Sequence, residues 1–162
     1  MNFQVERVTN ASALHECAKI MTSTPLWGET GYDLERCLQI LTHADVRVTG
    51  ALRDGKVIGF AGVLEPGMVF EPMIVVLCVA GESQGVGVGS ALMDALESDS
   101  ARMYLTVTET NAARQFYERR GWTYVGTLPD HEEPGVAELI MRWVRHGAAA
   151  TKATAPRPES AT

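Results

Sequence analysis

The stretch CVAGESQGVGVGSALMDALE, from Cys78 to Glu97, places three glycines between an apolar run and an amphipathic run. The residues before it, PMIVVLCV, are apolar at almost every position, which predicts a strand buried on both faces. The residues after it, SALMDALE, predict a helix. Glycine permits positive φ and close approach of a ligand, and a helix N-terminus presents unpaired N–H groups that bind anions. The stretch therefore predicts a pyrophosphate cradle, or alternatively a glycine-rich turn that only connects two elements.

Two nucleotide-binding motifs do not fit this stretch. A Walker loop needs a lysine after its last glycine, and none follows here. A dinucleotide fingerprint needs G-x-G-x-x-G, whereas Gly85, Gly87 and Gly89 are one residue too closely spaced. Asp54-Gly55 also predicts a tight hairpin in the first half, which departs from a repeating strand–helix order.

Size and charge narrow the class of protein. The 162 residues suit a single domain, expected at 1–146, and the tail 147–162 lacks large apolar residues and is expected to be disordered. A net charge of −6 argues against a nucleic-acid partner. No apolar run predicts a membrane span or signal peptide. Three cysteines without a C-x-x-C pair suit a reducing compartment, so a cytoplasmic protein is expected.

The rest of the chain predicts mixed helices and strands. Asn10 is an expected cap for a helix whose apolar face holds Leu14, Cys17, Ala18 and Met21. A second helix is expected over residues 34–41, with Thr30 and Asp33 as its capping box. Strands are expected around residues 3–5, 45–52, 56–65, 72–79, 101–108, 122–128 and 137–144, and helices around 90–97 and 111–121.

Two motifs point to a family. VVLCVAGESQGVGVGSALMDALE resembles motif A of the GNAT superfamily of acetyl-CoA-dependent N-acetyltransferases, in which Q/R-x-x-G-x-G/A follows a strand. LTVTETNAARQFYERRGWTYVG is similar to motif B, a strand followed by N-x-x-A-x-x-F-Y-E-x-x-G. The resemblance implies an α/β (α+β) GNAT fold, with one twisted, mixed, mostly antiparallel sheet of about seven strands. About four helices are expected to flank that sheet, and its central strands are expected to splay apart.

The resemblance also implies acetyl-CoA as cosubstrate. Its pyrophosphate is expected on the backbone of the glycine stretch, at Gln84, Gly85, Val86, Gly87, Val88, Gly89 and Ser90. The pantetheine arm is expected to pair with Leu77, Cys78 and Val79, with the Val79 N–H polarising the thioester carbonyl. The asparagine of motif B would fall on Thr110, whereas this chain has Asn111. Either the helix cap shifts by one residue, or Thr110 takes the polar role.

An amine acceptor must lose a proton before it attacks, because a lysine-like amine has a pKa of about 10.4. Many relatives carry a glutamate for this purpose where this chain has Met73. Glu71, two residues earlier and on the same side of the pleat, is the first candidate base, and a solvated carboxylate is its alternative. Glu138, inside the apolar AELIMRW, is the second, with a structural salt bridge as its alternative.

Tyr117 occupies the position where relatives place the proton donor for the departing thiolate, and a packed helix tyrosine is its alternative. Cys78 is more readily a small buried hydrophobe than a nucleophile. No metal-ligand spacing is present. The resemblance implies that STPLWGETGY and PDHEEPGV set the acceptor specificity, with Glu29 and Glu35 as candidates to shape the pocket. Trp27 and Tyr32 form an aromatic wall or pack in the core, and the segment with His131, Glu132 and Glu133 is a substrate-side loop or a solvated loop.

The expected function is direct transfer of an acetyl group to a primary amine. The competing hypothesis is a non-catalytic acyl-CoA sensor, which the missing carboxylate at Met73 favours. A homodimer is the commonest closed assembly and is the expectation here.

Overall fold

The computed structural model describes residues 2–29, 31–131 and 134–145; the expected tail at 147–162 lies outside the described residues. The strands are β1 Gln4–Arg7, β2 Val46–Arg53, β3 Lys56–Leu64, β4 Met73–Val79, β5 Arg102–Thr108, β6 Thr123–Leu128 and β7 Glu138–Val144. The helices are α1 Ala11–Ser23, α2 Pro25–Glu29, α3 Leu34–Leu41, α4 Val88–Asp99 and α5 Ala113–Arg119. Two short 3₁₀ turns, Met68–Phe70 and Gly81–Ser83, flank β4.

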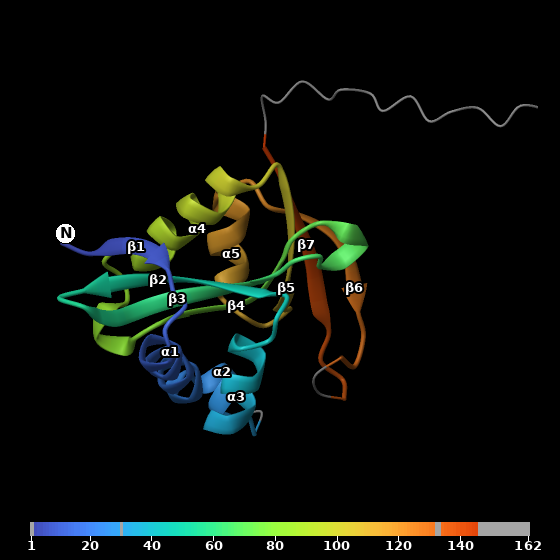
Figure 1. The fold of residues 1–162 in the computed structure, drawn as a ribbon. Coiled ribbons are helices and arrows are strands. Elements are labelled where there is room, and N and C mark those ends of the chain that lie inside the picture. Colours follow the sequence, from blue (N-terminus) through green and yellow to red (C-terminus); the bar gives the residue numbers. More distant parts are fainter. Residues whose placement is uncertain (1, 30, 132–133, 146–162) are drawn as a thin grey trace, which may run out of the picture.

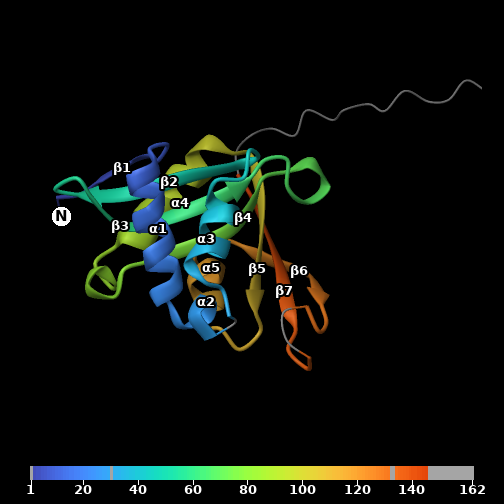
Figure 2. The ribbon, with the colours of Figure 1, turned by 60° about the horizontal axis from the view of Figure 1, so that its bottom comes forward.

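The seven strands form one sheet in the order β1-β2-β3-β4-β5-β7-β6. Among the strands of the described residues, only the β4–β5 pair is parallel, and α4 is the crossover between its two strands. Helices α1, α2 and α3 lie on one face, and α4 and α5 lie on the other (Figures 1 and 2). The expected mixed, mostly antiparallel sheet is confirmed, with five α-helices rather than about four.

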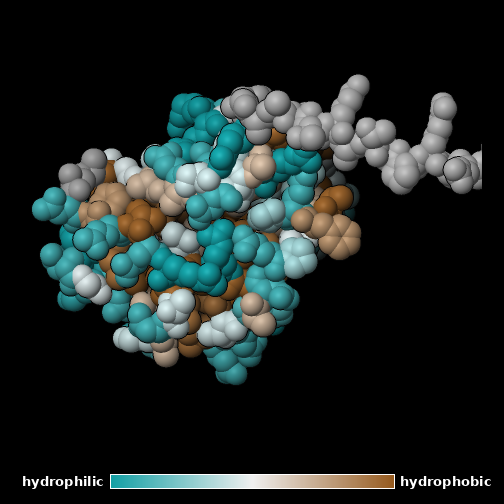
Figure 3. All heavy atoms as spheres, turned by 45° about the horizontal axis from the view of Figure 1, so that its top comes forward, coloured by the Kyte–Doolittle hydropathy of each residue, from teal (hydrophilic) through white to brown (hydrophobic). Residues whose placement is uncertain are grey.

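Each face of the sheet has its own core. Phe60 and Cys78 pack with α1 and α3 on one side, whereas Leu105 packs with α4, α5 and Trp122 on the other. Every residue of β3 from Val57 to Val63 is buried, because β3 is covered on both faces. Over the side that carries α4, hydrophilic side chains spread across the surface with apolar ones visible between them (Figure 3).

The strand expected to be buried on both faces, β4, is buried at only every second residue. Ile74, Val76 and Cys78 are buried, whereas Met73 and Leu77 are half-buried. The expectation was wrong because apolar side chains on β4 line cavities instead of a closed core.

Local signals explain most element ends. Asn10 caps α1, since its Oδ1 accepts a hydrogen bond from Ala13 N at 2.8 Å. The predicted Thr30–Asp33 capping box is wrong: Asp33 is itself the cap of α3 and accepts from Arg36 N at 2.8 Å. Thr30 lies outside the described residues. The hairpin at Asp54-Gly55 is confirmed, with φ of 51° and 76°.

Helix α2 was not predicted from the sequence. Its five residues begin at Pro25, whose fixed φ and missing N–H suit a first helical position. Among the described residues, no helix has both the length and the apolar character that a membrane crossing requires.

Candidate active site

The two parallel strands β4 and β5 separate soon after they meet. Their pairing consists of Met73 with Tyr104 and Ile74 with Leu105. On its other edge, β4 stays paired with β3 as far as Val79. A bulge leaves Val75 without a partner, because Gly62 pairs with Val76 and Val63 pairs with Ile74. The expected splay of the central strands is confirmed, and the gap widens toward the C-terminal ends of both strands.

Two cavities occupy this gap and its entrance. The first, which we call the strand cavity, has a volume of about 480 Å³ and is lined by β4, β5, the start of β7 and α2. The second, the glycine cavity, has a volume of about 690 Å³ and is lined by the glycine stretch and the end of β4. Residues that line both are Leu26, Trp27, Leu77, Asn111, Ala113 and Tyr117. The two cavities therefore meet in the gap between the strands.

The glycine stretch forms the floor of the glycine cavity. Gly85 and Gly87 have φ of 74° and 90°, a region that side chains strongly disfavour. Gly87 is the N-cap of α4 and supplies no side-chain cap, so the first N–H groups of the helix are available to a ligand. Six of the seven predicted phosphate-site residues line this cavity: Gln84, Gly85, Gly87, Val88, Gly89 and Ser90.

The exception is Val86, whose side chain is 37% exposed and does not line the cavity. The Gln84 side chain also turns back onto β4, where its Nε2 donates to Val79 O at 3.2 Å. This bond ties the loop to the end of the strand that the loop follows.

Ser83 was missed by sequence reasoning. It is 1% exposed and lines the glycine cavity, yet its Oγ has no hydrogen-bond partner among the described residues. A buried hydroxyl without a partner is costly, so a ligand oxygen at this point would restore its bond. With the positive-φ glycines and the uncapped helix, this hydroxyl fits a phosphate-bearing ligand.

The predicted pantetheine residues Leu77, Cys78 and Val79 all line the glycine cavity. They lie beyond the last β4–β5 pair, on the edge of β4 that faces the gap. Burial raises the pKa of the Cys78 thiol to about 11, so it is protonated at neutral pH. That protonation argues against Cys78 as a nucleophile.

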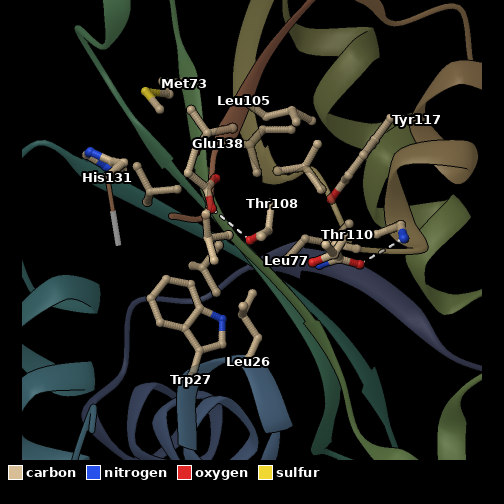
Figure 4. A pocket seen from close by; sticks show the side chains of 18 residues that line it. Leu26, Trp27, Met73, Leu77, Leu105, Thr108, Thr110, Tyr117, His131 and Glu138 are labelled. Atoms are coloured by element: carbon tan, nitrogen blue, oxygen red, sulfur yellow. Dashed lines mark hydrogen bonds between the residues drawn. The ribbon is translucent and has the colours of Figure 1, made fainter. Parts of the chain in front are cut away.

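Tyr117 extends from α5 into the region where the cavities meet, and its hydroxyl points into the strand cavity (Figure 4). The ring is 8% exposed and packs against Phe116 and Trp122, with centroids 5.3 Å and 6.0 Å away. Burial raises the pKa of Tyr117 to about 12, which keeps the phenol protonated across the neutral range.

Asn111 and Thr110 are now distinguished by position. Asn111 is half-buried, lines both cavities, and accepts a hydrogen bond from Ala113 N at 2.8 Å through Oδ1. Thr110 is exposed and lines the strand cavity alone. Because α5 begins at Ala113, the first turn of the helix is anchored by Asn111, one residue later than the family pattern places it.

Glu138, at the start of β7, lines the strand cavity and is 6% exposed. Thr108 lies directly across the β5–β7 pair and donates its hydroxyl proton to Glu138 Oε1 at 2.7 Å (Figure 4). No ion pair joins Glu138 to another residue in the described ranges. Successive strand side chains alternate, and Val107 packs with Tyr117. Glu138 and Thr108 therefore approach the gap from the face opposite Tyr117.

Glu71, the first candidate base from the sequence, lies outside both cavities. Its carboxylate is bound by two guanidinium groups, Arg142 at 3.1 Å and Arg102 at 3.3 Å. The lining of the strand cavity along β4 begins two residues later, at Met73. The short segment before β4 thus turns Glu71 toward the arginines of the neighbouring strands.

Some of the other residues expected at the acceptor site line the cavities, and others do not. Trp27 lines both cavities, and Tyr32 supports its ring edge-on at 5.1 Å without lining either. His131 lines the strand cavity, and Glu35 is exposed on α3 away from it. The side chain of Glu29 lies outside the described residues. Leu26, Thr108 and Val136 line the strand cavity and were not foreseen. Among the described residues, no cluster of His, Cys, Asp and Glu could hold a metal ion.

Comparisons with known proteins agree with this geometry. A family model described as an acetyltransferase (GNAT) domain matches residues 34–145. No protein with a curated description matches the chain by sequence.

Solved structures of similar fold include three acetyltransferases. The ribosomal-protein-S18-alanine N-acetyltransferase of Escherichia coli has a TM-score of 0.73 at 17% identity, over 93% of this chain and 98% of that one. A GNAT-family acetyltransferase of Bacillus cereus has a TM-score of 0.73 at 15% identity, over 90% and 99%. An aminoglycoside 6'-N-acetyltransferase complexed with coenzyme A has a TM-score of 0.72 at 16% identity, over 89% and 97%.

The family model spans both glycine stretch and α5, the two regions that carry motifs A and B. The match confirms the expected acyltransferase class and acetyl-CoA as the cosubstrate. The chain belongs to the GNAT acetyltransferase family.

Proposed function

We propose that this protein transfers an acetyl group from acetyl-CoA to a primary amine by direct attack within a ternary complex. The observation that supports it best is the meeting of the two cavities at Tyr117, in the gap between β4 and β5. One cavity has the features of a phosphate site and the other holds an isolated buried carboxylate. A cosubstrate entering through one can thus face an amine entering through the other.

The glycine cavity would hold the coenzyme. The uncapped start of α4 and the Ser83 hydroxyl supply donors for phosphate oxygens. At Leu77 and Val79, the edge of β4 that faces the gap has no strand partner in the described residues and offers backbone groups to the pantetheine amides, although the Val79 carbonyl also accepts from Gln84. The structure of the aminoglycoside enzyme with coenzyme A supports this placement by analogy of fold.

Glu138 is the proposed base, in place of Glu71. It lies in the strand cavity, it is buried, and one of its oxygens is oriented by Thr108. An amine substrate arrives mostly as an ammonium ion, and Glu138 accepts one of its protons, directly or through a water. Glu71 is committed to Arg142 and Arg102, outside the cavity.

Tyr117 is the proposed acid. The reaction joins the amine nitrogen to the acetyl carbon and breaks the carbon–sulfur bond, releasing an amide, coenzyme A thiol and one proton. Tyr117 donates its phenolic proton to the leaving sulfur, and the second proton lost by the nitrogen restores the phenol. Because the pKa of Tyr117 is raised to about 12, the phenol stays protonated at neutral pH and can act as the donor.

The competing function is an acyl-CoA sensor without turnover. The two are separated by measuring free thiol released from acetyl-CoA by the purified protein over a panel of primary amines, beside coenzyme binding by calorimetry. Thiol release that depends on both amine and enzyme supports the proposal. Tight binding of acetyl-CoA with no thiol release on any amine would establish the sensor instead.

We also propose a cytoplasmic location. The support is that Cys17, Cys37 and Cys78 are all free and buried, as in proteins of reducing compartments.

A further inference from the structure

We infer that the acceptor is a small amine with one positive charge on an apolar stem, bound in the strand cavity with its ammonium group at Glu138. The inference rests on the proposed function, and it names which class of amine that function uses. Three features of the strand cavity carry it: its single carboxylate, its apolar walls and its size.

The charge of the cavity matches one cation. Among the described lining residues, Glu138 is the only carboxylate, and the lining contains no lysine or arginine. Arg142, the nearest arginine on the same face of β7, comes four residues after Glu138 and is bound to Glu71. A buried anion needs a partner, and the described chain provides only the Thr108 hydroxyl. An ammonium ion would complete the site, whereas a polycation would bring several charges to one carboxylate.

Besides Glu138, the strand cavity has the polar side chains Thr106, Thr108, Thr110, Asn111, His131 and Tyr117, and the rest of its wall is apolar. Side chains that share this character, from α2, β4 and the segment before β7, are Leu26, Trp27, Met73, Val75, Leu77 and Val136. The Trp27 ring is fixed by Tyr32, at an interplanar angle of 83°. Apolar stems gain about 25 cal/mol per Å² on burial against such walls.

The size of the cavity limits the stem. A volume of about 480 Å³ lies in the range of small-molecule sites and must also admit the acetyl end of the coenzyme. The space that remains favours a short stem, such as a phenyl or hexyl chain, over a three-ring aminoglycoside. Glu138 and Met73 lie near each other in the strand cavity (Figure 4), so an ammonium group at Glu138 would have Met73 beside it.

The test compares amines of different class on the full chain. Initial rates of thiol release are measured with phenethylamine, hexylamine, putrescine, kanamycin and an alanine-terminated tetrapeptide. Binding of phenethylamine to the complex with coenzyme A is measured by calorimetry, as a readout independent of turnover. We expect kcat/KM for phenethylamine and hexylamine to exceed that for kanamycin and the peptide by at least about tenfold.

Two variants sharpen the comparison. Met73→Glu places a second carboxylate in the strand cavity, and we expect it to shift the kcat/KM ratio of putrescine to phenethylamine upward by about tenfold or more. Val69→Glu makes the same charge change four residues earlier, at a side chain that is 73% exposed and outside both cavities. We expect it to leave that ratio unchanged.

Each outcome decides one claim. Preference for kanamycin or the peptide, or an unchanged ratio in Met73→Glu, would overturn the acceptor class while the acetyltransferase function stands. Thiol release with none of the amines, despite coenzyme binding, would overturn the proposed function and the acceptor class together. A preference for phenethylamine and hexylamine, with a raised putrescine-to-phenethylamine ratio in Met73→Glu but not in Val69→Glu, supports the acetyltransferase function and the acceptor class.

Discussion

The hydroxyl of Tyr117 and the carboxylate of Glu138 reach the gap between β4 and β5 from opposite faces of the sheet. A proton donor and a proton acceptor on opposite sides of a reacting carbon avoid exchanging protons with each other. The surroundings of the two side chains also differ. Burial raises the pKa of Tyr117, whereas the Glu138 carboxylate accepts a hydrogen bond from the neutral hydroxyl of Thr108. In the proposed mechanism, acid and base thus differ in environment as well as in residue type.

Replacing Tyr117 by phenylalanine should lower kcat by about 10²–10⁴-fold, near the lower end because a thiolate is already a tolerable leaving group. The ring and its contacts with Phe116 and Trp122 remain, so acetyl-CoA affinity should change little. Turnover and a thermal melt are measured together. A lower melting temperature with full activity per folded molecule would show that Tyr117 only packs.

The two candidate bases are separated by matched substitutions. Glu138→Gln should lower kcat/KM by about 10²-fold or more, with the largest loss at low pH, where the amine depends most on assisted deprotonation. Glu71→Gln breaks the contacts with Arg142 and Arg102, so it should affect thermal stability and leave the rate per folded molecule near the parent value. The pH–rate profiles of both variants check this. The reverse pattern would return the role to Glu71.

At the scale of elements, a short loop before α4 forms the proposed coenzyme site. The role of its glycines could be predicted from the sequence, because backbone positions with positive φ are usually occupied by glycine. The role of Ser83 could not be predicted from the sequence, since it depends on the 3₁₀ turn that buries the hydroxyl. The position of Glu71 likewise could not be predicted from the sequence: pleat parity placed it beside Met73, but the segment before β4 is a turn, so Glu71 lies outside the strand cavity, whereas Glu138 lines it. Which of the two is the base stays a prediction.

Gly87→Asp should weaken acetyl-CoA binding by at least about 100-fold, since it places a carboxylate beside the phosphate donors and strains a residue at φ 90°. Gly55→Asp is the matched control: it imposes similar strain at φ 76°, in a hairpin away from both cavities. Calorimetry with acetyl-CoA compares the two. Equal losses of affinity would mean that backbone strain, not the cradle, explains the effect.

At the scale of the whole molecule, local patterns predicted the individual strands, the Asp54-Gly55 hairpin and both motifs, whereas the arrangement of the strands in one sheet was implied by the resemblance to the GNAT family. The sequence did not predict α2 or the bulge at Val75, since both follow from how distant segments pack. Trp27 on α2 lines both cavities, so the acceptor side of the site is the part least accessible to sequence reasoning. The expected homodimer stays a prediction.

Stability should fall as the pH rises above 9. Burial raises the pKa of Cys17 to about 12 and of Cys78 to about 11, from an ordinary value of 9.0. The folded thiols thus keep protons that the unfolded chain releases between pH 9 and about 12, and alkali favours unfolding. Denaturant midpoints from about pH 8 to about pH 11 measure this slope, and Cys78→Ala should reduce it. A flat profile would show that neither thiol is as deeply buried as the structure indicates.

The most direct test of the account is a paired measurement on the parent protein with acetyl-CoA and phenethylamine. Free thiol and acetylated amine are followed together, by absorbance and by mass spectrometry. Transfer in a ternary complex predicts one thiol for each acetylated amine, and no thiol release before the amine is added. Thiol released without amine, with the acetyl group retained on the protein, would contradict direct transfer at the meeting point of the two cavities.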